Sequence, residues 1–152
     1  MPGSTNRGKF RLLDHEFRIT ALPTNYFLAL VISSGSPGPD TNVLGDLTEI
    51  AAGNGYSAGG VSLDPNATDF DVITEDDGED RGVIQIKDIT ILAAGGPIPV
   101  SGPAAFAVVL TDDDVVLADR EIFYYWSLGA ETTILENNSL TLRDLTIRAR
   151  EI

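Results

Sequence analysis

The spacing of short runs of β-branched and aromatic residues, separated by Gly, Pro, Asn and Asp, most constrains the fold. Each run has the length of a strand and each break favours a turn, which is typical of a β-sandwich or barrel. The nearly continuous apolar run 26–32 is expected to be a central strand covered on both faces. We predict an all-β fold, a β-sandwich or jelly-roll-like single domain with at most one or two short helices. Strands are expected near residues 26–33, 56–63, 83–92, 104–111, 121–128 and 139–148.

The chain is predicted to consist of an extended N-terminal arm, residues 1–9, and one domain, residues 10–152. With 152 residues, of which 43% are hydrophobic, it is long enough to bury a core without disulfides. Residues 10–20 are compatible with a short helix or with a strand, and both alternatives stay open. The clearer helix candidate is 42–50, where Asn42 would be the cap and apolar residues recur every third position.

Two segments, 84–92 and 140–148, share an irregularity. In each, apolar residues alternate with period two but change phase after a basic residue and an Asp. One inserted residue at Lys87-Asp88, and one at Arg143-Asp144, would return the apolar side chains to a common face. Both strands are therefore predicted to bulge or bend at these sites.

The chain is strongly acidic, with 23 Asp and Glu against 10 Lys and Arg and a net charge of −13. Repulsion from phosphate backbones follows, so no nucleic-acid partner is expected. The acids concentrate in residues 69–80 and 112–114. Both runs are predicted to be solvated loops, with calcium binding as the alternative, and the second would be the tip of a β-hairpin formed by 104–111 and 115–117.

Catalytic chemistry has few groups available. The absence of Cys excludes a thiolate nucleophile and a Cys-based metal site, and the chain has one histidine, His15, and no Gly-x-Ser-x-Gly elbow. A pair of glycosidase carboxylates is not excluded by counting, but no acid lies between Glu121 and Glu131 around the aromatic run. We therefore expect no enzyme, no cofactor and no required metal. No apolar stretch is long enough to cross a membrane, so no membrane partner is expected.

The run Phe123-Tyr-Tyr-Trp126 requires both faces of one strand to carry large side chains. One face belongs to the core, and the other meets either a neighbouring subunit or the chain's own arm. Because the arm has no apolar side chain beyond Met1, it is expected to lie against a neighbouring subunit, with Arg7 or Lys9 meeting acidic partners. The candidate interface residues are Arg7, Lys9, Phe10, Phe123 and Tyr125.

A series of short segments follows one another in an informative order. They are 12–15, 26–31, 46–50, Gly53-Asn-Gly-Tyr-Ser-Ala-Gly-Gly-Val61, 89–91, 96–100, 106–110, Tyr125-Trp-Ser-Leu-Gly129 and 140–142. This order resembles a family of small structural proteins of tailed bacteriophages, and the resemblance covers most of residues 12–148. It implies a β-sandwich or jelly-roll subunit of the virion, commonly a capsid-decoration or tail-associated protein and often a trimer, with no catalytic residues.

The resemblance implies a cement protein that decorates a bacteriophage capsid and stabilises it by binding between capsid subunits. Its partners would be the major capsid protein and further copies of itself in a homotrimer, on the exterior of the virion capsid after assembly in the host cytoplasm. The alternative is a tail- or fibre-associated module that binds another virion protein or a host glycan. The number of copies in each virion distinguishes the two.

Overall fold

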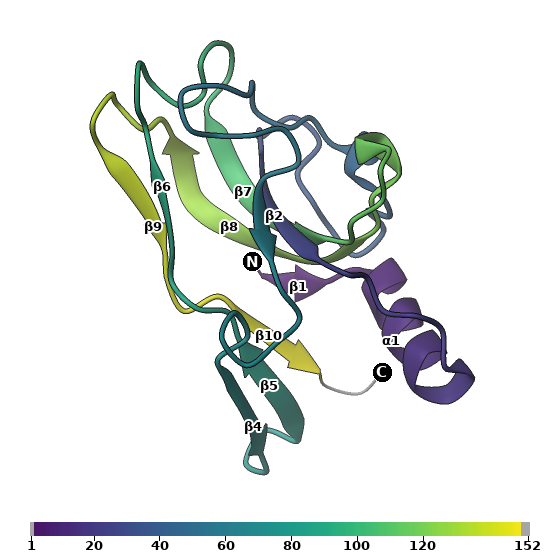
Figure 1. The fold of residues 1–152 in the computed structure, drawn as a ribbon. Helices are drawn as coiled ribbons and strands as arrows, with labels where there is room; N and C mark the ends of the chain where they lie inside the picture. The colour runs from purple at the N-terminus through teal and green to yellow at the C-terminus, as the bar shows by residue number, and fades with distance from the viewer. Residues whose placement is uncertain (1, 150–152) are drawn as a thin grey trace.

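The computed structural model describes residues 2–149 and confirms the all-β, sandwich-like fold, with one α-helix near the N-terminus (Figure 1). In chain order, the elements are β1 (Gly3–Ser4), α1 (Asn6–Arg18), β2 (Tyr26–Val31), η1 (Leu44–Asp46), β3 (Val61–Leu63), β4 (Val72–Asp76), β5 (Arg81–Gln85), β6 (Ile89–Leu92), β7 (Ala105–Thr111), η2 (Leu117–Asp119), β8 (Ile122–Thr132), β9 (Ser139–Leu142) and β10 (Thr146–Ala149).

Within residues 2–149 the strands form three antiparallel sheets. The largest has the order β1-β8-β7-β2-β3, the second has the order β10-β5-β4, and β6 pairs with β9. The β6–β9 ladder stands across from β7 and β8, and the main core fills the space between them (Figure 1). Leu30 and Val108 from the large sheet and Ile91 and Leu142 from the β6–β9 ladder all belong to this core.

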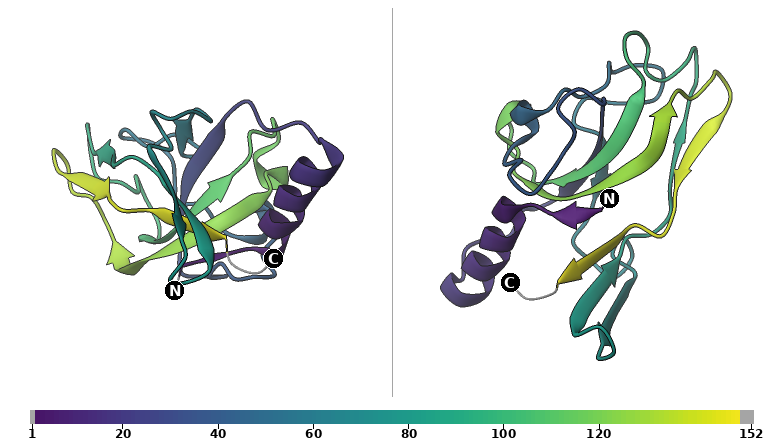
Figure 2. Two further views of the ribbon diagram at one scale, coloured as in Figure 1. Left: turned by 90° about the horizontal axis from the view of Figure 1, so that it is seen from below. Right: turned by 180° about the vertical axis from the view of Figure 1, so that it is seen from behind.

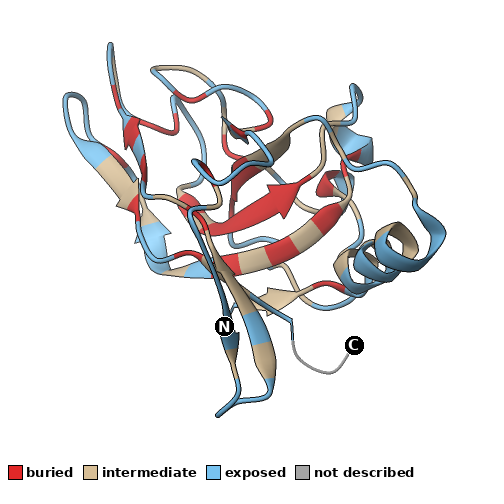
Figure 3. Ribbon diagram, turned by 60° about the horizontal axis from the view of Figure 1, so that its bottom comes forward, coloured by how far each residue is buried: buried red, intermediate tan, exposed pale blue. Residues whose placement is uncertain are grey.

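The apolar run of β2 is covered on both faces, as its sequence predicts. Leu28 and Leu30 face the main core, whereas Ala29 and Val31 join a second buried cluster with Leu44 on the other side of the sheet. Because both faces are covered, β2 and the neighbouring β7 are buried along most of their length (Figure 3). Burial on both faces explains why these strands are apolar without alternation.

Both predicted irregularities in the 84–92 and 140–148 segments are present, and they are larger than a bulge. The β5–β10 ladder ends where Gln85 pairs with Thr146, and the β6–β9 ladder begins where Ile89 pairs with Leu142. Between the ladders the backbone N–H of Ile86 donates to the carbonyl of Leu145 at 2.9 Å. Each segment therefore bends from one sheet into the next at the predicted place.

Two local predictions are wrong. Residues 42–50 form only the short 3-10 turn η1, because Asp46 accepts the N–H groups of Asn42 and Val43 and the chain then extends so that Ile50 N–H donates to Leu30. The partners of β7 are β2 and β8, and residues 115–117 do not form a hairpin with it.

The acidic runs are more ordered than solvated loops. Asp112 accepts the N–H of Glu121 at 3.0 Å, and Asp113 accepts the N–H groups of Thr24 and Asn25. Acidic side chains in residues 112–114 therefore hold neighbouring loops in place instead of forming a free hairpin tip.

The first acidic run, residues 69–80, contains strand β4, which the sequence analysis missed. β4 and β5 form a hairpin that projects from one end of the molecule, seen at the bottom of Figure 1. Asp69 is buried, and it accepts the Asp64 N–H at 2.7 Å and pairs with Lys87. The hydrogen bond from Lys87 holds the pKa of Asp69 below its usual range.

Candidate interaction surface

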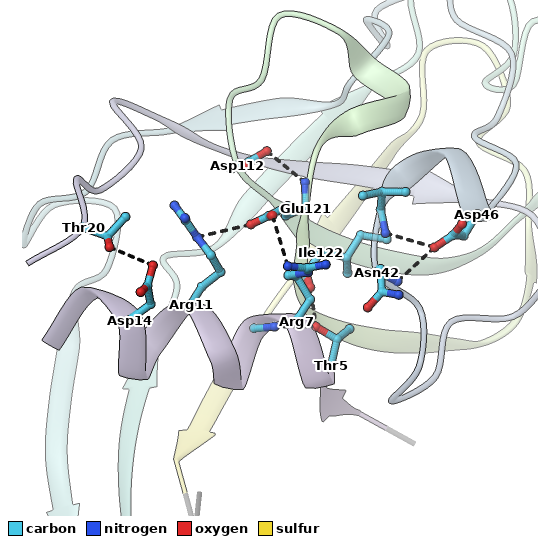
Figure 4. A network of polar contacts seen from close by, with 12 residues as sticks. Thr5, Arg7, Arg11, Asp14, Thr20, Asn42, Asp46, Asp112, Glu121 and Ile122 are labelled. Carbon is cyan, nitrogen blue, oxygen red and sulfur yellow. Dashed lines mark hydrogen bonds and ion pairs between the residues drawn. The ribbon is translucent and has the colours of Figure 1, made fainter. Parts of the chain in front are cut away.

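The N-terminal segment is fixed to its own chain rather than extended away from it. Gly3 pairs with Tyr125 in the short β1–β8 ladder, and the N–H of Thr5 donates to Phe123 O at 3.1 Å. Thr5 is fully buried; its hydroxyl donates to the Ile122 carbonyl and accepts the N–H of Gly8, so it also caps α1 (Figure 4).

Charged side chains extend this attachment along α1. Glu121 at the start of β8 pairs with Arg7 at 3.7 Å and with Arg11 at 3.2 Å (Figure 4). The side chain of Asn6 donates to Asp40. The expectation of an extended arm held only by a neighbouring subunit is therefore wrong, since buried polar groups and ion pairs replace the apolar burial that the segment lacks.

An apolar groove of about 690 Å³ lies between α1 and β10. The side chains that line it include Leu12 from α1, Tyr26, Phe123 and Tyr124 from the sheet, and Ile147 from β10. Two of the aromatic rings on its floor are in contact, with the Tyr26 and Phe123 centroids 5.6 Å apart in an edge-to-face arrangement. We call this cavity the α1 groove.

The charge of the α1 groove is opposite to that of the whole chain. Four of the ten Lys and Arg residues line it: Lys9, Arg11, Arg81 and Arg148. No acidic residue of the described part of the chain lines it, although the chain holds 23. The groove therefore favours a ligand that combines apolar groups with negative charge.

The face of α1 that points away from the groove is also apolar. Phe10, Leu13 and Phe17 are spaced by three and four residues, which places them on one side of the helix. The side chains are exposed, Phe10 by 52% and Phe17 by 78%. We call these three residues the outer stripe. Figure 3 shows α1 coloured as exposed and intermediate along its length, and none of its residues is buried.

The five predicted interface residues are distributed over three surfaces. Lys9 and Phe123 meet in the α1 groove, and Phe10 belongs to the outer stripe with Arg7 over its ring at 5.7 Å. Tyr125 packs against the second buried cluster and lies beside Gly3. The chain's own N-terminal segment lies along the aromatic strand, where β1 pairs with its edge and Gly8 lies close to the backbone of Phe123.

Other chemistry is sparse in residues 2–149. His15 lines the α1 groove, and its Nδ1 lies 2.7 Å from the carbonyl of Thr20. No group of three or more His, Asp or Glu in this part of the chain is arranged to hold a metal ion. The described helix α1 is too short and too polar to span a bilayer.

The outer stripe and the buried cap are the features that the sequence analysis missed. The signals were present, because Thr5 is a favoured N-cap residue and Phe10, Leu13 and Phe17 have helical spacing. They remained undetected because residues 10–20 also fit a strand, and no helix face is defined until the helix is assigned.

Comparison of the chain with models of known protein families, with curated proteins and with solved structures finds no match.

Proposed function

We propose that this chain is a non-enzymatic virion structural protein that decorates a bacteriophage capsid and stabilises it by binding between capsid subunits. The observation that supports this most directly is the outer stripe. Large apolar side chains gathered on one exposed helix face are typical of a surface that contacts another protein. The resemblance in segment order suggests which protein that is, the major capsid protein.

The way in which α1 is held also favours a structural role. Buried Thr5 and the ion pairs of Glu121 fix the helix to β8, so the stripe is presented in one orientation. A surface that is ordered before binding loses less conformational entropy when it meets its partner. Contacts that are weak in one copy give strong overall binding when many copies bind one shell. Copies that also associate with one another increase this binding by multivalency.

Replacing Phe10 and Phe17 with serine in one variant is expected to weaken binding to capsids that lack the protein at least about tenfold, because the apolar contact is lost. Cosedimentation of the purified protein with such capsids measures this. The fold should be unaffected, since both side chains are exposed.

Leu135→Ser is the matched control, because Leu135 is 63% exposed and lies between β8 and β9, away from α1. It should bind as the unmodified chain does. Unchanged binding of the Phe10→Ser/Phe17→Ser variant would remove the outer stripe from the proposal.

A further inference from the structure

We propose that the α1 groove of one copy receives the β4–β5 hairpin of a second copy of this chain. This inference rests on the self-association that belongs to the proposed function, and it adds which two surfaces meet. The groove has an apolar floor and cationic walls, and the hairpin carries the opposite charge together with exposed apolar side chains.

The cations of the groove stand on both of its walls. Lys9 and Arg11 belong to α1, whereas Arg81 and Arg148 belong to β5 and β10. A ligand with one anionic head would need the positive charge at one end. Charge on both walls instead suits a polypeptide that carries several carboxylates along its length.

Two of these cations already hold a carboxylate of the same chain. Arg11 pairs with Glu121 at 3.2 Å, and Arg81 pairs with Asp76 at 2.8 Å. Lys9 and Arg148, one on each wall, have no carboxylate within ion-pair distance among the residues that the structure describes. The groove is therefore left with a positive site on either side of an apolar floor.

The β4–β5 hairpin has the complementary chemistry. Residues 71–80 contain six acids, and Glu75 and Asp77 are exposed. On the same hairpin Ile73 is 77% exposed, and Val72 is also exposed. An element that presents large apolar side chains between acids matches a groove with an apolar floor between bases.

The hairpin cannot enter the groove of its own chain. β5 pairs with β10 from Gly82 to Gln85, so the hairpin is held to the wall of the groove that Ile147 and Arg148 form. Figures 1 and 2 show α1 and the hairpin projecting from the same end of the sandwich, apart from one another. Contacts between the groove of one copy and the hairpin of the next would be heterologous, and they close into a ring when the rotation allows it.

Charge exchange tests the proposal. The groove variant Lys9→Glu/Arg148→Glu and the hairpin variant Glu75→Lys/Asp77→Lys are each expected to weaken self-association at least about tenfold, because like charges would then face one another. Joining all four substitutions in one chain restores opposite charges and should return the association constant to within about threefold of the original. Sedimentation equilibrium of the full chain at low and high salt measures these constants.

Glu136→Lys is the matched control, since Glu136 is exposed in the segment before β9 and lies on neither surface. It should associate normally, and circular dichroism should show every variant folded. An oligomer that is indifferent to both pairs of substitutions would overturn the inference and leave the proposed function standing. A monomer at all concentrations would overturn the inference together with the self-association. Loss of capsid binding with an unchanged oligomer would also overturn it, and would assign the groove to the capsid.

Discussion

Replacing Gly8 with alanine is expected to lower the free energy of unfolding by about 1–3 kcal/mol and to loosen α1 from β8. A Cβ at Gly8 would lie 2.3 Å from the carbonyl oxygen of Phe123 and 2.7 Å from its Cα. Because these atoms belong to the backbone of β8, they cannot move aside as a flexible side chain would. The helix must retreat instead, and the contacts of Thr5 with β8 are strained or lost.

The sign of the change in the free energy of unfolding distinguishes an effect of tertiary packing from one of helix propensity. Alanine stabilises a helix interior by about 1 kcal/mol relative to glycine, so an undocked helix would gain from the substitution. Gly82→Ala is the control, because Gly82 is exposed in β5 and a Cβ there meets nothing within 4 Å. Denaturant unfolding and amide exchange of α1 measure both variants. Stabilisation by Gly8→Ala would show that α1 is not held against β8 in solution.

Replacing Gly60 with alanine should have a still larger effect, a loss of about 3–5 kcal/mol or failure to fold. A Cβ at this position would lie 1.8 Å from the carbonyl oxygen of Leu28 and 2.7 Å from the Cα of Ala29, two buried residues of strand β2. Gly60 also has a φ of +90°, which disfavours any side chain. Steric overlap and backbone strain therefore act together beside the central strand.

Gly102→Ala separates these two causes. Gly102 also has a positive φ, +76°, but a Cβ there meets nothing within 4 Å. The Gly102→Ala variant should lose only the free energy of unfolding that the backbone strain costs, about 1 kcal/mol. Thermal or denaturant unfolding of the two variants gives the comparison. Equal losses at the two positions would mean that the close approach of Gly60 to β2 does not determine stability.

The sheet structure was largely accessible from the sequence because it depends on local apolar patterns. The bends at Lys87-Asp88 and Arg143-Asp144 were predicted from a phase change in the apolar alternation. In a regular strand such a change would move the apolar side chains to the other face, so the backbone must bulge or bend to keep them on one face. Paired glycines inside a strand-like run, such as Gly59-Gly60, are typical of a close backbone approach. Strand β4 was missed because its acidic residues are typical of a solvated loop. The strand is stabilised by pairing with β5 rather than by burial.

The candidate site was less accessible because it depends on contacts between distant parts of the chain. Thr5 is buried and its hydroxyl donates to the carbonyl of Ile122, and Glu121 binds two arginines of α1. No periodic pattern in residues 1–9 predicts these contacts with distant residues. The groove likewise forms only when the chain folds, since Lys9 and Arg148 are far apart in the sequence and line the same cavity.

The number of copies of this protein in each virion tests the proposed function most directly. Under the proposed function the chain is a virion component, and quantitative mass spectrometry of those purified virions, with the major capsid protein as the internal reference, would provide that number. A decoration protein repeats with the capsid lattice, so we expect on the order of several hundred copies per virion. A count between a few copies and a few dozen would contradict capsid decoration and would place the chain in the tail.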